Sequence, residues 1–148
     1  MIRIERLTGY DVRLAEDMGK LLMSLTTKYD GKAVEKEWID WVVQSPWHDE
    51  LVAFDEDGKL VGMATLSVVM GAKIDRNAYL EDFVVDAEAR GKGIGGKMWE
   101  EMLKWGREKG CKRLEFTSSG KDMKCGAVRF YVHKGAEIRD TNFFRVEL

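Results

Sequence analysis

The sequence contains few of the residues that build disulfide frameworks and metal sites. Its 148 residues include two cysteines, two histidines and one proline. Cys111 and Cys125 are too few for a disulfide framework, and their spacing matches no zinc-binding pattern. His48 and His133 lie far apart in the sequence, so we expect no metal site.

Long apolar runs and an excess of basic charge are also missing. No run of 18 apolar residues occurs, so we expect no membrane span. The first six residues lack the apolar core of a signal peptide, which favours a cytoplasmic protein. The 24 Lys and Arg residues against 26 Asp and Glu give a net charge of −2, so we expect no nucleic-acid partner.

The composition is typical of a packed globular protein. Hydrophobic residues make up 45% of the chain and charged residues 34%, which argues against disorder. A chain of this length fits one domain, and we therefore predict a single domain over residues 1–148.

Hydrophobic periodicity predicts the order of the helices and strands. Strands are predicted over 2–7, 50–54, 60–69, 78–85, 113–117, 136–139 and 143–146. Helices are predicted from Thr8 or Asp11 to Leu25, over 33–44, from the glycine-rich segment to Lys109, and over 124–133. This order, β-α-α-β-β-β-α-β-α-β-β, indicates an α/β (α+β) fold with one mixed, mostly antiparallel central sheet. We expect about seven strands and about four helices.

A glycine-rich segment, Gly91–Gly96, lies between a predicted strand and a predicted helix. Backbone N–H groups at a helix start carry partial positive charge and bind phosphate readily. Glycine allows that backbone to approach an anion because no Cβ stands in the way. The segment therefore predicts an anion site, and the alternative is a plain strand-to-helix turn.

Two nucleotide motifs also match the letters of this segment. Gly91-x-Gly93-x-x-Gly96 satisfies the dinucleotide fingerprint, but residues 86–90 separate it from the strand and too few residues follow for a doubly wound sheet. The same segment followed by Lys97 imitates a P-loop. There, however, Met98 stands where a Ser or Thr must hold magnesium, so neither motif explains the segment.

A third pattern, Arg90-x-x-Gly93-x-Gly95, resembles the acetyl-CoA signature of the GNAT N-acetyltransferase superfamily. The preceding strand, 79–85, resembles the central strand of that family. Residues 127–136 resemble its A-x-x-F-Y-x-x-x-G element. The resemblance implies a GNAT-like domain that transfers acetyl from acetyl-CoA to a primary amine by direct attack.

The resemblance also implies which residues bind acetyl-CoA, with no metal involved. The glycine-rich turn is expected to hold the pyrophosphate, and the strand amides to pair with the pantetheine arm and the thioester oxygen. Lys124 stands where the family commonly has Asn. The implied residues are Phe83, Val84, Val85, Arg90, Gly91, Lys92, Gly93, Ile94, Gly95, Gly96, Lys124 and Ala127.

The chemistry needs a base, because a primary amine with a pKa near ~10.4 is almost wholly protonated at neutral pH. Glu81 and Asp82 are the candidates, Glu81 as the catalytic base, and strand alternation predicts one on each face. The alternative is a solvated edge pair, although acids in an apolar stretch are costly unless used or paired. The resemblance assigns the proton donor to Tyr131, whose alternative role is packing beside Phe130.

The acceptor amine stays open among several classes. The resemblance is greatest to the diamine and polyamine (spermidine/spermine) branch, through 79–83 and 134–136. Glu81, Asp82 and Asp140 are then the implied substrate-binding acids, since polyamines carry several cationic nitrogens. Another small amine, a peptide amine, or a non-catalytic acyl-CoA-binding sensor are the alternatives. Because family members are often homodimers, we expect a homodimer.

Overall fold

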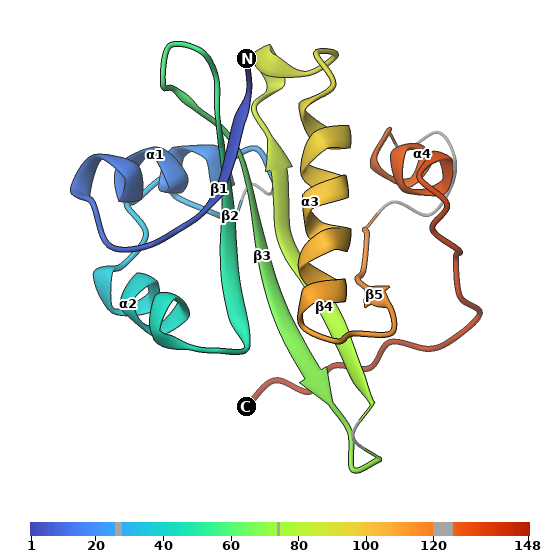
Figure 1. Cartoon of the computed structure of the whole chain (residues 1–148). Helices are drawn as coiled ribbons and strands as arrows, with labels where there is room; N and C mark the ends of the chain where they lie inside the picture. Colours follow the sequence, from blue (N-terminus) through green and yellow to red (C-terminus); the bar gives the residue numbers. More distant parts are fainter. Residues whose placement is uncertain (26–27, 74, 120–125) are drawn as a thin grey trace. The chain divides into compact units, whose positions relative to one another are not determined.

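The computed structural model of the chain describes residues 1–25, 28–73, 75–119 and 126–148. It contains two compact units, Met1–Phe116 and Thr117–Leu148, which are described separately (Figure 1). The elements of the first unit are β1 Arg3–Arg6, α1 Val12–Leu22, α2 Lys36–Gln44, β2 His48–Phe54, β3 Leu60–Met70, β4 Arg76–Val85, the short 3-10 helix η1 Ala87–Ala89, α3 Ile94–Glu108 and β5 Leu114–Glu115. The second unit contains α4 Gly126–His133.

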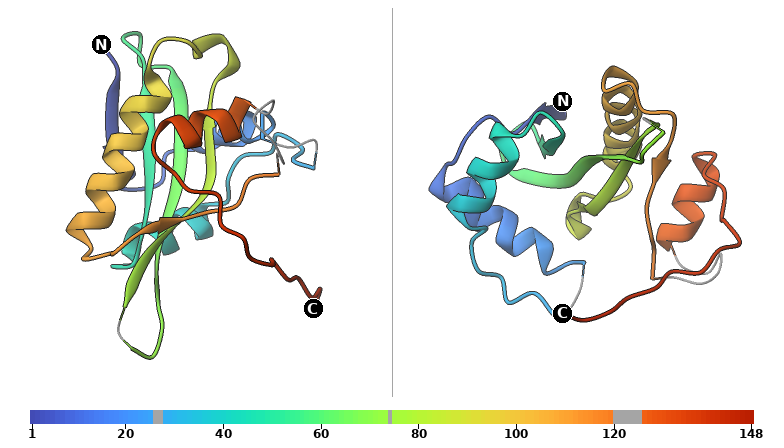
Figure 2. Two further views of the ribbon diagram at one scale, coloured as in Figure 1. Left: turned by 90° about the vertical axis from the view of Figure 1, so that its right-hand side faces the viewer. Right: turned by 90° about the horizontal axis from the view of Figure 1, so that it is seen from below.

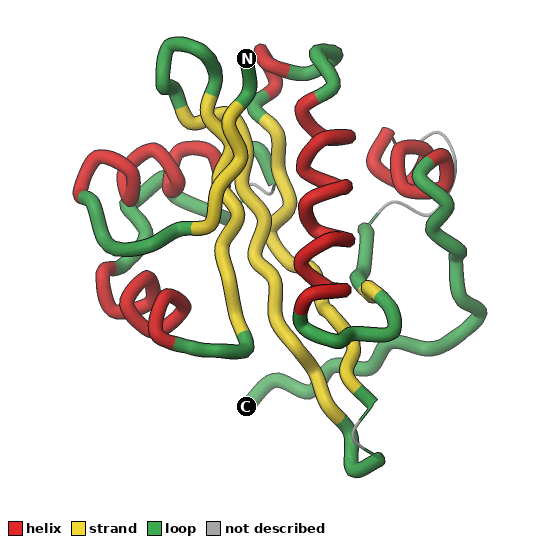
Figure 3. Tube along the Cα trace, in the orientation of Figure 1, coloured by secondary structure: helices red, strands yellow, loops and turns green. Residues whose placement is uncertain are grey.

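The first unit is built on a five-stranded sheet in the order β1-β2-β3-β4-β5 (Figure 3). Strands β1 to β4 pair antiparallel, and β4 pairs parallel with β5. A tight turn joins β2 to β3, in which the Asp55 carboxylate accepts hydrogen bonds from the N–H groups of Asp57 and Lys59. The parallel pair needs a crossover, and α3 provides it.

Helices cover both faces of this sheet, with α1 and α2 on one face and α3 on the other (Figure 2). Val52 and Met63 on neighbouring strands belong to a buried cluster with Met18 of α1. On the opposite face, Gly62 lies against the sulfur of Met98 on α3. Successive strand residues therefore serve two cores, as the alternation of side chains requires.

Both early helices are shorter than the periodicity predicts. Helix α1 begins after Asp11, whose carboxylate accepts a hydrogen bond from the Leu14 N–H at 2.9 Å. It ends at Leu22 because residues 23–25 bond to carbonyls three positions back, which tightens the last turn. Helix α2 begins only at Lys36. The Val34 N–H donates instead to the carbonyl of Ala15, at 3.0 Å, and holds that loop against α1.

The loop over residues 31–34 crosses α1 close to Gly19, and we therefore expect Gly19→Ala to destabilise the protein. A Cβ at Gly19 would overlap the carbonyl oxygen of Lys32, so the backbone of one segment must shift. We expect a loss of about 1–3 kcal/mol in the free energy of unfolding, measured by urea denaturation. Gly9→Ala is the matched control, since a Cβ there meets no atom within 4 Å. Equal midpoints for the two variants would contradict the prediction.

The prediction of about seven strands is wrong, because the sheet of the described residues has five. The predicted strands over 136–139 and 143–146 form no ladder, and Phe143, Phe144 and Val146 are exposed. Strand β5 is limited to Leu114–Glu115. Alternation makes a strand possible, but a strand forms only where a neighbour supplies backbone partners.

The second unit contains one described helix. Residues 126–133 confirm most of the helix predicted over 124–133, and its first two residues lie outside the described part of the chain. Val128 is its one buried residue. The prediction of a single domain over residues 1–148 stays a prediction. None of the helices in the described residues combines the length and hydropathy that a bilayer-spanning segment needs.

Candidate active site

The glycine-rich turn leads from the end of β4 into the start of α3, as predicted. Asp86 fixes the exit from β4: its N–H donates to the Val61 carbonyl and its carboxylate accepts from the Glu88 N–H. The hydrogen bond from the Glu88 N–H, together with the Lys59 ammonium at 3.1 Å, lowers the pKa of Asp86. The Arg90 guanidinium donates back to the Val85 carbonyl at 3.2 Å, so it braces the turn.

Two residues of the turn adopt the left-handed backbone conformation that favours glycine. Gly91 and Gly93 each have φ of +78°, and Gly93 is the N-cap of α3. A Cβ at either position would meet no atom within 4 Å, so this side of the turn is open. No side chain caps the start of α3, and its first turn holds no acid. The N–H groups of Ile94, Gly95 and Gly96 therefore suit an anion such as a pyrophosphate.

Strand β4 is irregular where the site acids lie. Met63 pairs with Val84 and Thr65 pairs with Glu81, so Asp82 and Phe83 both stand opposite a single residue of β3. This is a β-bulge, and Asp82 has φ of +49°, which is unusual for a residue other than glycine. Bulges re-aim side chains, so simple alternation fails here.

The other edge of β4 pairs with β5 over two residues only, Ala78 and Tyr79. Beyond Tyr79, within the described residues, β4 has no ladder to a strand on this side. Phe83, Val84 and Val85 lie at the end of this strand, and residues 86–90, which include η1, connect it to the glycine-rich turn.

The two acids of β4 differ in their surroundings. Glu81 is exposed, whereas Asp82 is half-buried and accepts a hydrogen bond from the Tyr29 hydroxyl at 3.4 Å. Desolvation raises the pKa of Asp82. The charges of Asp82 and, more weakly, Glu81 raise the pKa of Tyr29. Both charges therefore act on the same phenol, and the bulge interrupts the regular alternation behind the prediction of one acid on each face of the strand.

Glu50 on β2 is a further acid of this sheet, and the sequence pattern was not used to predict it. Among the described residues it is the one ionisable side chain that is fully buried, at 0% exposure. The Thr65 hydroxyl donates to its Oε2 at 2.6 Å, and its Oε1 has no partner among the described residues. Burial raises the pKa of Glu50 to about 8, and the charge of Asp82 acts in the same direction. Alternation with Val52 and Phe54 was the available signal, since it assigns Glu50 to an apolar face.

The remaining predicted site residues lie in the second unit. Tyr131 is half-buried on α4, and its ring packs edge-on against Phe130 with centroids 5.5 Å apart. Ala127 is exposed in the first turn of α4, and Asp140 is exposed beyond the helix. Lys124 lies outside the described residues.

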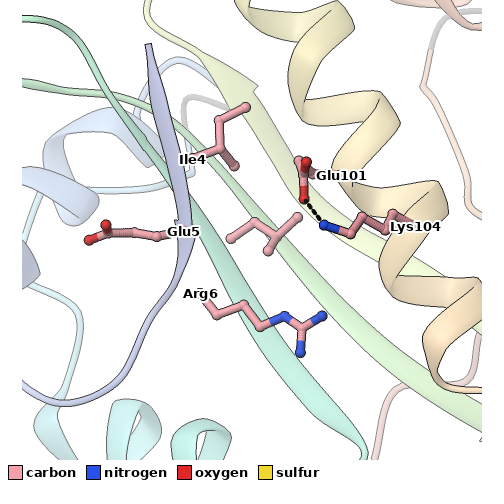
Figure 4. A pocket seen from close by; sticks show the side chains of 6 residues that line it. Ile4, Glu5, Arg6, Glu101 and Lys104 are labelled. Atoms are coloured by element: carbon pink, nitrogen blue, oxygen red, sulfur yellow. Dashed lines mark ion pairs between the residues drawn. The ribbon is translucent and has the colours of Figure 1, made fainter. Parts of the chain in front are cut away.

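A shallow pocket of about 260 Å³ lies elsewhere, between β1 and α3 (Figure 4). Its charged residues pair with one another or with near neighbours, as in Lys104 with Glu101 and Arg6 with Glu108. None of the predicted site residues lines it. Among the residues described by the structure, no three potential ligands form a metal-binding group.

Comparison with known proteins agrees with this geometry. Residues 15–136 match the acetyltransferase (GNAT) family. Glucosamine 6-phosphate N-acetyltransferase 1 of Oryza sativa subsp. japonica is 30% identical over 96 residues, which cover 59% of this chain and 58% of that protein. The chain thus matches under two thirds of the length of this curated relative.

Solved structures of low identity share the fold. An aminoglycoside acetyltransferase from an uncultured soil metagenomic sample has a TM-score of 0.84 at 15% identity, over 100% of this chain and 99% of that one. Glucosamine-6-phosphate N-acetyltransferase from Arabidopsis thaliana has a TM-score of 0.78 at 19% identity, over 99% and 98%. The family match covers most of the chain, and the protein therefore belongs to the acetyltransferase (GNAT) family.

Proposed function

We propose that this protein is an N-acetyltransferase that acetylates a primary amine of a small cationic molecule by direct attack. The observation that carries the proposal is the open start of α3, where Gly91 and Gly93 adopt positive φ. When bound, acetyl-CoA supplies an activated acyl group. The new N–C bond forms as the thioester C–S bond breaks.

The donor side of the proposed site consists of backbone and nearby cations. The N–H groups of residues 94–96 would bind the pyrophosphate at the positive end of the α3 dipole, with Lys92 or Lys97 adding charge. The amides of residues 83–85 would pair with the pantetheine arm and the thioester oxygen. The resemblance further supports Ala127 and Lys124 as proposed coenzyme-binding residues.

On the acceptor side we propose Asp82 as the base, with Glu81 as the second candidate. Asp82 is half-buried, and desolvation raises the pKa of its carboxyl and so increases its affinity for a proton, whereas Glu81 is exposed. The φ of +49° at Asp82 supports this choice, since strained conformations persist where the fold uses them. Tyr131 would give a proton to the departing thiolate.

The acceptor class follows from charge. Glu81 and Asp82 are the acids of β4, and Asp140 is an exposed acid of the second unit. Acids favour a cationic amine, and a diamine or polyamine is the finer proposal. An amino sugar or aminoglycoside is the other small amine to test, since the relatives above are named for such acceptors.

We also propose that the protein forms a homodimer in the cytoplasm.

A thiol-release assay with acetyl-CoA tests the proposal. The panel contains diamines, polyamines, amino sugars, aminoglycosides, amino acids and short peptides, with calorimetric CoA binding measured in parallel. Amine-dependent CoA release with a small amine supports the enzyme, and release with peptides alone would reassign the acceptor. Binding of CoA with no product from any amine would instead favour an acyl-CoA sensor.

We expect Gly93→Ala to raise the KM for acetyl-CoA about tenfold or more. The methyl group would occupy the open side of the turn, where we place the pyrophosphate. Gly58→Ala is the matched control, since Gly58 has φ of +79°, a Cβ there also meets no atom within 4 Å, and it lies in the β2–β3 turn. Both variants thus place alanine at nearly the same positive φ. An unchanged KM for Gly93→Ala would contradict the pyrophosphate assignment.

A further inference from the structure

A buried carboxyl with an unpartnered oxygen lies beside the proposed base. Glu50 is fully buried, and its Oε1 has no hydrogen-bond partner among the described residues. Such an atom is costly in a protein interior, and a buried polar group that persists without a partner calls for an explanation. The proposed acetyl transfer does not by itself use Glu50.

The sheet register brings Glu50 toward Asp82. Glu50 pairs with Thr65 across β2 and β3, and Thr65 pairs with Glu81 across β3 and β4. The next residue is Asp82, which the bulge re-aims. The charge of Asp82 adds to burial in raising the pKa of Glu50. Three adjacent strands therefore build the pair, with the Thr65 hydroxyl holding Glu50 from one side.

We propose that Glu50 is a positioning residue that acts through Asp82. The two form a coupled carboxyl pair, and the charge on Glu50 sets how strongly Asp82 takes a proton from the acceptor amine. This inference rests on the proposed N-acetyltransferase function and deepens it by defining the acceptor side of the site.

Three other titratable residues, Tyr29, Glu81 and His48, lie near Glu50 and Asp82 in the fold or in the sequence. Tyr29, from the loop between α1 and α2, donates to Asp82, and Glu81 acts on that same phenol. His48 lies two positions before Glu50 on β2, with its ring bonded to Ser45. Burial lowers the pKa of His48, so it is neutral when Glu50 titrates.

The negative charge of Asp82 adds to burial in raising the pKa of Glu50 to about 8. Near pH 7 Glu50 therefore holds its proton. Above about pH 8 Glu50 releases that proton to solvent. The second negative charge then opposes ionisation of Asp82 and increases its affinity for the amine proton.

The kinetic test compares the wild type with Glu50→Gln over pH 6–9. The glutamine is neutral at every pH. The two kcat/KM values should therefore agree within about twofold near pH 6, and the wild-type value should be about tenfold higher at pH 9. Protonation of the free amine cancels in this ratio. A merely structural role would lower kcat/KM by one factor at every pH, and that result would overturn the proposal.

Carboxyl 13C titration by NMR tests the pair without substrate. In Asp82→Asn the Glu50 midpoint should fall by about one pH unit, and in Thr65→Val it should rise because the hydrogen bond that favours the ionised form is lost. Asp57→Asn, at an exposed turn residue, should leave it unchanged. Thr65→Val is nearly isosteric, so it keeps the test decisive if Glu50→Gln fails to fold.

The two proposals fail in distinguishable ways. If the Glu50 midpoint moves with Asp82 but no amine on the panel is acetylated, the coupled pair stands and the proposed function fails. If an amine is acetylated but the Glu50 midpoint is the same in wild type and Asp82→Asn, the coupled pair is overturned alone.

Discussion

Replacing Asp82 with asparagine is expected to lower kcat/KM for the acceptor amine by about 10²- to 10⁴-fold, the range that loss of a general base produces. Asparagine keeps the shape of the side chain but cannot accept the amine proton. The wild-type kcat/KM should fall as the pH drops through the Asp82 pKa, which burial raises above its usual value. That acidic limb should disappear in the variant. Initial rates of CoA release across pH 5–9 measure both effects.

Two further variants make this result specific. Glu81→Gln removes the neighbouring, exposed acid and should cost less than about tenfold in kcat/KM, since it alters charge but not the proposed proton acceptor. Asp57→Asn makes the same change of charge in the exposed β2–β3 turn and should match the wild type. A larger loss in Glu81→Gln than in Asp82→Asn would return the base to Glu81.

Tyr131→Phe is expected to lower kcat by about 10²-fold or more, with little change in the KM for acetyl-CoA. The phenylalanine retains the ring contact with Phe130 and removes only the hydroxyl that we propose protonates the thiolate. Steady-state kinetics give the kcat, and thermal unfolding checks that the fold is kept.

Tyr10→Phe is the matched control for this change. Tyr10 is 40% exposed in the loop before α1, and loss of its hydroxyl should leave kcat unchanged. An unchanged kcat in Tyr131→Phe would remove the tyrosine from the mechanism and assign it to packing.

Local chemistry was the part of the molecule that could be predicted from the sequence. A glycine-rich segment followed by an amphipathic stretch marks a helix start wherever it occurs, and α3 does begin at Ile94 after the turn. The resemblance to acetyltransferases rests on the same local letters, and the family match confirms it. The polyamine branch stays a proposal, because acceptor recognition depends on residues from several elements.

The errors arose where tertiary structure overrides a local pattern. Strand alternation places Glu81 and Asp82 on opposite faces, but a bulge depends on the register with β3, which the sequence of β4 alone does not specify. Glu50 was overlooked for a related reason. Its burial depends on how α1 and α2 cover the sheet, a property of packing rather than of the strand itself.

The prediction of a C-terminal hairpin was wrong for the opposite reason, since the strand pattern is present but no partner strand is found among the described residues. Residues 136–139 and 143–146 have the apolar content of strands, yet they form no ladder within the described part of the chain, and Phe144 is 84% exposed. Periodicity describes one chain segment, whereas a sheet is a relation between two.

The crossing of residues 31–34 over α1 affects the entropy cost of binding an acceptor at the proposed site. The bond from Val34 to Ala15 and the close approach of Lys32 to Gly19 fix this end of the loop once the protein folds. Tyr29 lies only two residues before that crossing. At the acceptor site proposed above, the Tyr29 hydroxyl beside Asp82 would therefore be close to a part of the loop that is already ordered, and little of the binding free energy of an amine would be spent on ordering it.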